Sequence, residues 1–541
     1  MKPISTKTWE LLNALKANQS LWQRLLVPHD PPLWGFEEIG ASGESLILPH
    51  LTPFLLHQRQ DVRESAQRAV QTLVAATQSQ DFVELDDHCR QEWSNGLDGS
   101  SAWTHIKPAQ INSVAGDPVR AAVLGLASFH NSGYIRAEAV KQLSNIQDGS
   151  EFPFLLVRVN DWVESVRNSA TQAMFARIQP ENTGPFFHHL SLVLRLQICG
   201  RTQHQPLVSA IKNLLSGPTA QPLLRGGLLS EDRWLRRESA RLATDSIKNA
   251  GPDLLDDLLF HFDPVVRHWA ARNGLSAVKT GTLRPILAKL LRDGSVPVRC
   301  EALNILAQRF PEEANDALTG ALLDRHSSVR TVARFWITTK APTFDCASFY
   351  RENLSQPQTC RAAILGLSES GSSTDAELIL PFHKTPVVSL RKDVIKSLAA
   401  LNGDHHVDLF LSDLTHEHPG ISNQAARALL GRSHAVSDRL LNIFRHDTHP
   451  HVRKNAFGLL RKQAVWASGI FLFEALRDRD EIIVELGRKG LRDWLKRSSS
   501  VFVAPTTAEA DELRSALKAS AGMFSDQELR QLEFCLKTNS Q

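Results

Sequence analysis

The sequence lacks paired cysteines and a long apolar segment, and its first residues do not follow the pattern expected of a signal peptide. Its six cysteines are scattered, and no two of them form a CxxC pair. This spacing disfavours a disulfide framework or a cysteine-based zinc site and is typical of a reducing compartment. No stretch approaches the ~20 apolar residues that span a bilayer, and the first residues hold no apolar core followed by a cleavage site. We therefore expect a soluble, cytoplasmic protein of bacterial type.

The sequence also lacks the short motifs that mark common catalytic sites. It contains no P-loop, GxSxG, GxGxxG or HExxH motif. His446, His449 and His451 form an HxxHxH cluster in a predicted turn, but no cysteine lies near them to complete a tetrahedral zinc site. We therefore predict that the chain is not an enzyme and that it binds neither a metal nor a cofactor.

The chain also has no large excess of positive or negative charge. The net charge is only +3 over 541 residues, whereas a protein that binds nucleic acid through a dominant basic surface is usually more asymmetric. Aromatic residues make up 7% of the chain, which suits helices that pack through Leu, Ala and Val. Because the chain is too long for one compact core, we expect several domains or a repeat array.

A repeated pattern dominates what is present: an aliphatic residue, an arginine, two variable residues and a small or apolar residue. After Arg236 the pattern recurs at positions 267, 299, 330, 361, 391, 423 and 453, with steps of 30 to 32 residues and Asn423 in place of one arginine. Chance matches would not stay in phase over seven steps. The pattern therefore predicts structural anchors of a repeat at Arg267, Arg299, Arg330, Arg361, Arg391 and Arg453.

Each repeat is long enough for two helices. The apolar residues at 298, 302, 305 and 306 share one helical face, and the turn before them holds Asp, Gly, Ser and Pro. The small residue three positions after each arginine lies on the packing face, so we expect Ala333 to be buried and Arg334 to point outward. The period predicts an all-α solenoid of stacked antiparallel helix pairs.

Several anchors carry an aspartate six residues upstream, as in Asp324 with Arg330 and Asp447 with Arg453. With this feature the chain resembles the HEAT repeat family, in particular its short bacterial variant in bilin-lyase-like (PBS-lyase-type) proteins, over roughly residues 50–497. The resemblance implies a right-handed superhelical array in which the Asp and Arg side chains form a ladder of hydrogen bonds. It is unspecific for function, because the fold has many partners.

The repeat register divides the chain into five parts. They are an N-terminal helical cap (1–49), an irregular HEAT-like array (50–200), a register break with an extra helix (201–218), a regular array of ~31-residue repeats (219–497), and a linker with a C-terminal helical hairpin cap (498–541). Leu21, Trp22 and Leu25 contribute to the first cap. Capping boxes at Thr506 with Glu509 and at Ser525 with Glu528 begin the helices of the last one.

Positive charge collects near the end of the regular array. Residues 432–497 hold 14 Lys and Arg against 8 Asp and Glu, so this region is the best candidate for binding RNA, DNA or another polyanion. The candidate residues are Arg453, Lys454, Arg461, Lys462, Arg488 and Lys489. Four aromatic residues could stack on bases or could simply belong to the core: Phe457, Trp466, Phe471 and Trp494.

A weaker resemblance concerns alkylpurine DNA glycosylases built from HEAT-like repeats. The segment around Trp234, Arg236 and Arg237 resembles one of theirs, and Asp161-Trp162 is the nearest match to their catalytic Asp beside a Trp. The alternative is that both segments are ordinary repeat turns. A DNA glycosylase or bilin-lyase-type protein is therefore one alternative function.

The principal prediction is a non-catalytic scaffold or adaptor that binds a protein partner on its curved surface. A second basic series, five residues after some anchors, could line a groove for an acidic partner or could be solvated helix surface. This series comprises Arg68, Lys141, Arg241, Arg272 and Lys396. Binding of nucleic acid or another polyanion by the basic C-terminal repeats is the first alternative.

Overall fold

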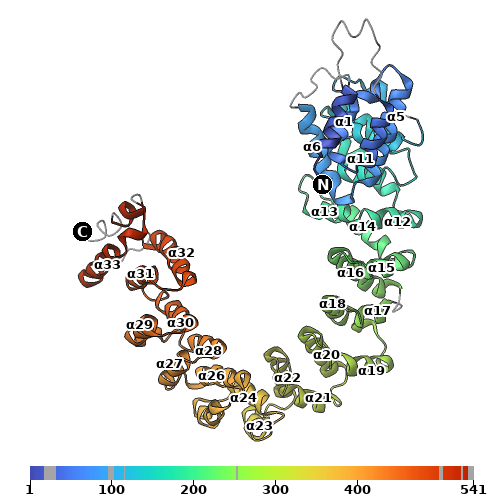
Figure 1. Ribbon diagram of the computed structural model, residues 1–541. Helices are drawn as coiled ribbons and strands as arrows, with labels where there is room; N and C mark the ends of the chain where they lie inside the picture. The colour runs from blue at the N-terminus through green and yellow to red at the C-terminus, as the bar shows by residue number, and fades with distance from the viewer. Residues whose placement is uncertain are drawn as a thin grey trace. The chain divides into compact units, whose positions relative to one another are not determined.

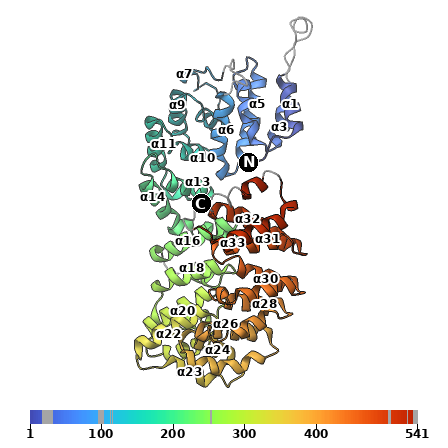
Figure 2. The same ribbon diagram turned by 90° about the vertical axis from the view of Figure 1, so that its left-hand side faces the viewer.

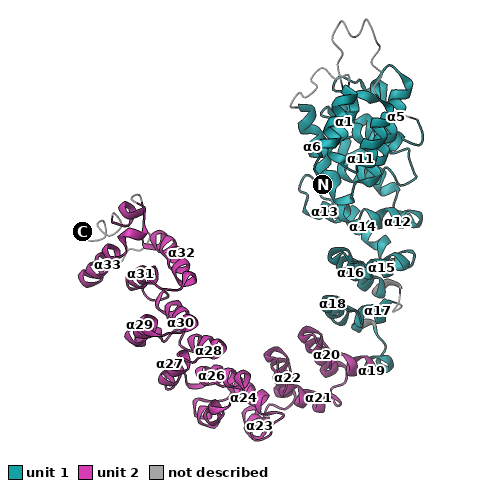
Figure 3. Cartoon of the chain, in the orientation of Figure 1, with its two compact units in different colours: residues 1–283 teal, residues 284–541 magenta. Residues whose placement is uncertain are grey.

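The computed structural model describes residues 1–16, 32–94, 103–111, 113–114, 116–250, 254–498, 504–525 and 528–533. Within these ranges the chain forms α-helices joined by turns and short 3-10 helices, with no β-strand (Figure 1). The prediction of an all-α fold is confirmed. The chain divides into two compact units, residues 1–283 and 284–541, which Figure 3 distinguishes by colour.

Unit 1 begins with irregular helix packing and continues as helix pairs. Its helices are α1 (Thr6–Lys16), α3 (Leu33–Ala41), α4 (Leu48–Leu51), α5 (Gln60–Ala76), α6 (Phe82–Ser94), α7 (Pro108–Ile111), α8 (Arg120–Ala127), α9 (Gly133–Leu143), α10 (Phe152–Arg158), α11 (Glu164–Ala176), α12 (Thr183–His188), α13 (Leu190–Arg195), α14 (Gln205–Leu215), α15 (Gln221–Leu228), α16 (Arg233–Ala250), α17 (Leu255–Leu259) and α18 (Pro264–Gly274). Helix α14 lies within the predicted register break at 201–218.

Unit 2 is more regular. Helix α19 (Thr280–Leu290) contains the boundary between the units. The helices that follow are α20 (Val296–Arg309), α21 (Ala314–Leu322), α22 (Ser327–Lys340), α23 (Cys346–Asn353), α24 (Cys360–Ser370), α25 (Ala376–Ile379), α26 (Val388–Asn402), α27 (Val407–Leu414), α28 (Pro419–Ala428), α29 (Ser437–His446), α30 (Pro450–Leu460), α31 (Val465–Ala475), α32 (Glu481–Ser498) and α33 (Thr507–Ala519).

In both units the second helix of each pair packs against the second helix of the next pair. In unit 1, α16 contacts α18, and each also contacts the shorter helix before it, α15 or α17. In unit 2, α24, α26, α28 and α30 follow one another in a row (Figure 2), with α27 packed on α28 and α29 on α30. Each pair therefore buries its apolar face between its neighbours, which is the arrangement of an α-solenoid.

The small residues of the repeat pattern occupy the tightest part of this packing. Each alanine three positions after an anchor arginine is fully buried, including those after Arg63, Arg136 and Arg167, which carry the same pattern in the irregular array. A larger side chain there would hold adjacent helices apart. These alanines are Ala66, Ala139, Ala170, Ala270, Ala302, Ala333 and Ala456. The predicted helix phase is thereby confirmed at these repeats.

The expected exposure of Arg334 is wrong. Its Nη1 atom donates to the Tyr350 hydroxyl at 3.3 Å and to the Glu369 carboxylate at 2.8 Å. The long arginine side chain reaches α23 and α24 and is 17% exposed.

The two ends of the chain are described in part. The predicted capping boxes are present, with Thr506 and Glu509 at the start of α33, and Ser525 and Glu528 joined by reciprocal hydrogen bonds. Leu21, Trp22 and Leu25 lie outside the described residues, as does the end of the predicted C-terminal hairpin, residues 534–541.

We expect Ala333→Glu to lower the free energy of unfolding of unit 2 by about 3 kcal/mol or more, because it places an unpaired carboxylate between packed helices. The control is Thr338→Glu on the same helix, at an exposed position, which should change that free energy by less than about 0.5 kcal/mol. Urea unfolding followed by far-ultraviolet circular dichroism measures both. Equal effects would contradict the helix phase.

Candidate functional site

The anchor arginines turn back over the loop that precedes their own helix. In α20, Arg299 Nη1 donates to the main-chain oxygen of Asp293 at 2.8 Å, six residues upstream. Arg167 makes the same bond to Asp161 at 2.8 Å, and Arg453 makes it to Asp447 at 3.1 Å. The guanidinium therefore satisfies carbonyl groups of the turn that no helix could pair.

The remaining guanidinium nitrogens reach the next repeat. Arg299 Nε and Nη2 donate to the Asp324 carboxylate, both at 2.9 Å, and Asp324 lies 25 residues downstream. Arg453 binds Asp478 in the same bidentate way, both bonds being 3.0 Å. This geometry gives strong, directional hydrogen bonds, because the planar fork of arginine matches a carboxylate.

The turn aspartates Asp161 and Asp324 thus each join two consecutive repeats. The Asp324 carboxylate binds Arg299 of the preceding repeat and also accepts from the backbone nitrogen of His326 at 2.8 Å. Its main-chain oxygen accepts from Arg330 of its own repeat. The ladder implied by the resemblance is therefore present, but the carboxylate binds the arginine 25 residues before it and not the one six residues after it.

The anchors differ in how completely they follow this rule. Arg267 donates to the main-chain oxygens of His261 and Phe262 at 2.7 and 3.1 Å. Arg330 uses Glu369 as its carboxylate. Arg361 pairs with Asp393 at 2.5 Å on an exposed surface, and Arg391 pairs with Asp413 at 2.5 Å. Neither Arg361 nor Arg391 shows the bonds to upstream carbonyls.

These contacts remove Arg453 from the candidate polyanion-binding residues. Its side chain is 2% exposed and is held by Asp478, so it is part of the ladder. Lys454, Lys462, Arg488 and Lys489 are exposed, and Arg461 is half-buried. The four aromatic residues proposed for base stacking, Phe457, Trp466, Phe471 and Trp494, are all buried in the core. That interpretation is wrong, because their helical spacing directs them toward the neighbouring helices.

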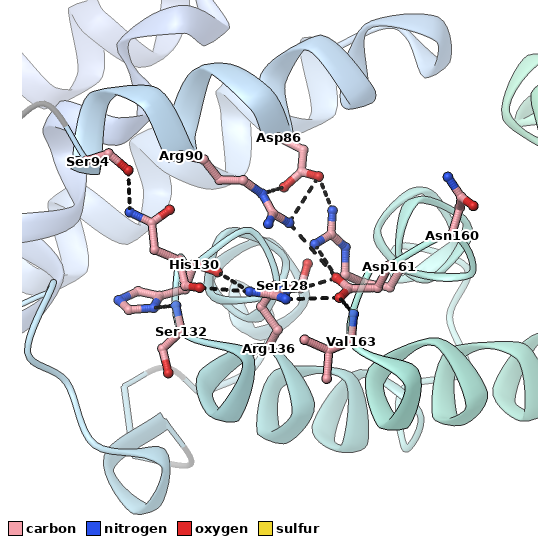
Figure 4. A network of polar contacts seen from close by, with 12 residues as sticks. Asp86, Arg90, Ser94, Ser128, His130, Ser132, Arg136, Asn160, Asp161 and Val163 are labelled. Carbon is pink, nitrogen blue, oxygen red and sulfur yellow. Dashed lines mark hydrogen bonds and ion pairs between the residues drawn. The ribbon is translucent and has the colours of Figure 1, made fainter. Parts of the chain in front are cut away.

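Asp161, in the turn before α11, belongs to a larger network of charged side chains (Figure 4). Arg136 of α9 and Arg158 at the end of α10 both donate to its carboxylate, at 2.8 to 2.9 Å. Arg158 also pairs with Asp86 of α6, and Arg90 donates to Asp86 at 2.8 Å. The sequence indicated Asp161 and, through the repeat pattern, Arg136. It did not indicate Asp86 and Arg90, which come from a helix far from this turn in the chain, or Arg158, which follows no repeat pattern.

This network makes Asp161 unsuitable as a catalytic carboxylate. Both of its oxygens accept hydrogen bonds from guanidinium groups, and Oδ1 also accepts from the backbone nitrogen of Val163. Burial alone would raise the pKa of Asp161, but the hydrogen bonds from Arg136 and the charge of Arg158 outweigh it and lower that pKa. A carboxylate that stabilises a substrate cation must face the substrate, whereas this one faces two arginines.

The other segment that suggested a glycosylase is also structural. Arg236 and Arg237 both pair with Asp263, at 3.5 and 3.1 Å, and Arg236 donates to the Ser230 main-chain oxygen. These are ladder contacts between α16 and the turn before α18. The described contacts therefore favour the interpretation of both segments as repeat turns.

Histidine replaces the turn aspartate in three repeats of unit 1, at His57, His130 and His261. His130 lies six residues before Arg136, and its Nδ1 accepts from the backbone nitrogen of Ser132 at 2.9 Å. Its Nε2 lies 3.2 Å from the main-chain oxygen of Trp103, so these partners require the neutral ring with its proton on Nε2. His261 makes equivalent bonds to Asp263 and Leu228, both at 3.0 Å.

The histidines predicted to form a cluster take ordinary turn contacts. His449 Nδ1 lies 3.2 Å from Asp447, and His451 Nε2 lies 3.2 Å from the main-chain oxygen of His416. Among the described residues, no group of three or more His, Cys, Asp and Glu side chains is arranged to hold a metal ion.

The ladder and the helix pairs can now be compared with known proteins. A family model described as HEAT repeats matches residues 251–335, which include the anchors Arg267, Arg299 and Arg330. The chain contains HEAT repeats. No curated protein shows a significant sequence match. No helix among the described ranges combines the length and the apolar character needed to cross a membrane.

Several solved structures resemble the chain over most of its length. Importin beta in an ammonium sulfate condition is 13% identical, with a TM-score of 0.39, over 98% of this chain and 80% of that one. The S. pombe condensin Cnd3-Cnd2 subcomplex is 15% identical, with a TM-score of 0.33, over 98% and 87%. A structure of Kap95p binding to RanGDP is 10% identical, with a TM-score of 0.36, over 93% of this chain and 66% of that one.

A groove of about 610 Å³ lies on the second-helix face of the HEAT repeats in unit 1. Trp234 and Arg241 of α16, Trp269 of α18 and Lys212 of α14 are among its lining residues. The Arg241 guanidinium lies 4.5 Å from the centre of the Trp269 ring. Of these residues, the sequence indicated only Arg241 as a possible groove residue, through the basic series five positions after the anchors.

We expect His130 to make unit 1 less stable as the pH falls from about 6.5 to about 4. Burial lowers the pKa of His130 to about 4, whereas a histidine in the unfolded chain titrates near 6.5. Between these values the unfolded state binds more protons, so stability decreases as the pH falls, by up to about 3 kcal/mol.

Calorimetric unfolding at pH 7.5 and pH 5.0 measures this dependence. His130→Asn should reduce it only in part, because His189 of the same unit, whose pKa burial lowers to about 3, contributes with the same sign. His105→Asn, at an exposed histidine of the same unit, should leave it as in the wild type. The same pH dependence in His130→Asn as in the wild type would exclude His130 as its source.

Proposed function

We propose that this chain is a non-catalytic scaffold whose HEAT repeats in unit 1 bind a protein partner. The observation that carries the proposal is a set of exposed apolar side chains on two consecutive repeats, next to the groove between α14, α16 and α18. We call this set the apolar strip. It comprises Leu229, Trp234, Phe260, Phe262 and Val265.

The strip follows the repeat register. Leu229 and Phe260 are 31 residues apart, as are Trp234 and Val265 and as are the anchors Arg236 and Arg267. Because α16 packs against α18, equivalent positions of these two repeats lie on the same side of the array. The exposed apolar groups therefore form a recurrent feature of adjacent repeats and not a single chance exposure.

The exposure of these residues is large for their size. Leu229 is 77% exposed, Phe262 is 67% exposed and Trp234 is 43% exposed. Isolated exposed apolar residues are common, but a contiguous group on a folded protein typically marks an interaction surface. Trp and Arg are also the side chains that most often dominate binding energy at protein interfaces, and Trp234 and Arg241 line the same groove.

The described contacts favour this surface over the basic C-terminal repeats. Part of the positive charge of residues 432–497 is neutralised by carboxylates, since Arg432 pairs with Asp404, Arg439 with Asp408 and Arg445 with Glu474. The aromatic residues of that region are buried. What supports polyanion binding there is a set of exposed lysines and arginines, among them Lys454, Arg488 and Arg492, which are equally typical of a solvated helix surface.

The test compares the wild-type chain with the double variant Trp234→Ala/Arg241→Glu as baits for affinity purification. We expect proteins that bind the wild type to be recovered at least tenfold less by the variant, because loss of a central aromatic and reversal of a groove charge typically cost more than about 1.4 kcal/mol. Titration calorimetry with the purified partner then gives the change in Kd.

Tyr134→Ala is the matched control, since Tyr134 is an exposed aromatic residue of unit 1 that does not line the groove. This variant should recover the same proteins as the wild type. Equal recovery by all three baits would contradict binding through the groove and the strip.

A further inference from the structure

A second cavity, of about 170 Å³, adjoins the charged network around Asp161. Arg90 and Arg158 line it from α6 and α10, and Arg195 and Arg201 line it from the end of α13 and the loop that follows. Trp162 borders the cavity and is 56% exposed. Four arginines from separate elements therefore converge on one small space.

Two of the lining residues are not required by the ladder. The position of Arg158, three before the turn aspartate, is occupied by Leu290, Ala321 and Phe444 in regular repeats of the chain. The position of Trp162 is occupied by Gly294, Arg325 and Thr448 in the same repeats. A buried arginine costs free energy unless it is well paired, so its presence at this one repeat needs a separate explanation.

The network carries more positive than negative charge. Five arginines, counting Arg136, meet three aspartates, of which Asp86 and Asp161 already accept bonds from two arginines each. The buried nitrogens Arg90 Nη1 and Arg158 Nε have no hydrogen-bond partner, and Arg195 and Arg201 pair with no carboxylate among the described residues. Unsatisfied buried donors of this kind commonly indicate a missing ion or water.

The electrostatic surroundings of Arg158 agree with this excess. Burial lowers the pKa of Arg158, Asp86 opposes that effect, and the neighbouring charge of Arg90 adds to it. A further negative charge in the cavity would offset the repulsion between these guanidinium groups.

The Trp162 ring packs against arginine side chains on the open side of the cavity. Its ring centre lies 4.4 Å from the Arg90 guanidinium, 5.1 Å from that of Arg136 and 5.8 Å from that of Arg201. Arg201 is fixed further by a 2.9 Å bond to the Asn160 main-chain oxygen. Arg90 and Arg201 are thus held against the same indole ring, which preorganises them.

We propose that this cavity binds a phosphate-type oxyanion of a small molecule. Donors that approach from four different elements suit a tetrahedral group with several oxygens, whereas a planar carboxylate is satisfied by a single guanidinium fork. The volume accommodates one phosphate group, since a water molecule occupies about 30 Å³. The site is independent of the partner-binding groove, which is lined by other residues.

Isothermal titration calorimetry of the full chain with inorganic phosphate tests the proposal, with sodium chloride at matched ionic strength as the blank. We expect saturable binding of one phosphate, and at least tenfold weaker binding by Arg195→Gln/Arg201→Gln. These substitutions change the mouth of the cavity and leave the buried ladder intact. The control Arg439→Gln, at an exposed arginine of unit 2, should bind as the wild type does.

Three outcomes would overturn the proposal. They are no saturable heat in a wild-type sample with a native circular dichroism spectrum, unchanged affinity in the Arg195→Gln/Arg201→Gln variant, and acetate binding as tightly as phosphate. A phosphate monoester such as glycerol phosphate that binds at least as tightly as inorganic phosphate would identify an esterified ligand, whereas binding of inorganic phosphate alone would identify the free ion.

Discussion

The bidentate contact between an anchor arginine and the aspartate 25 residues downstream determines how one repeat is placed on the next. The aspartate caps its own turn, receives the arginine of the preceding repeat and offers its main-chain oxygen to its own arginine. Each charged group is thereby paired within a largely buried interface. Because an arginine without its carboxylate would leave an uncompensated buried charge, the two side chains must be retained together.

The Asp–Arg contacts between repeats also limit which residues can bind a ligand. The ladder contacts use the anchor arginines of the repeat pattern, and carboxylates hold these arginines in place, as at Arg299 and Arg453. A ligand could reach those guanidinium groups only by breaking the contact between repeats. Binding must therefore use residues that the ladder leaves exposed, such as Trp234 in the apolar strip, or charges that the ladder does not need, such as Arg158.

The sequence predicts the repeat architecture well because the repeat is local. The period of the anchors and the buried alanines, including Ala302 and Ala333, follow from helical geometry within a single repeat. Several anchors have an aspartate six residues upstream, and its carboxylate, as at Asp324, binds the arginine of the preceding repeat. The spacing alone is equally compatible with a pair inside one repeat. A one-dimensional spacing cannot distinguish these two pairings, because both recur with the same period.

The parts that the sequence missed depend on contacts between distant segments. Arg90 meets Asp161, and Asp86 meets Arg158, only because α6 packs against α10, and no local signal indicates that. His130 and His261 do carry a local signal, since they occupy the position of the turn aspartate, and this substitution could have been identified from the register. Trp494 was ambiguous, because helical spacing is the same for a buried ring and for a stacking one.

A double-mutant cycle on Arg299 and Asp324 tests the central claim most directly. Amide hydrogen exchange in α20 and α22 of Arg299→Met, Asp324→Asn and the double variant gives the local free energies of opening. We expect each single change to cost about 3 kcal/mol and the coupling energy to exceed about 1.5 kcal/mol, whereas the exposed pair Arg284 and Glu313 should show a clearly smaller coupling. Additive single effects would contradict the account of how the repeats are joined.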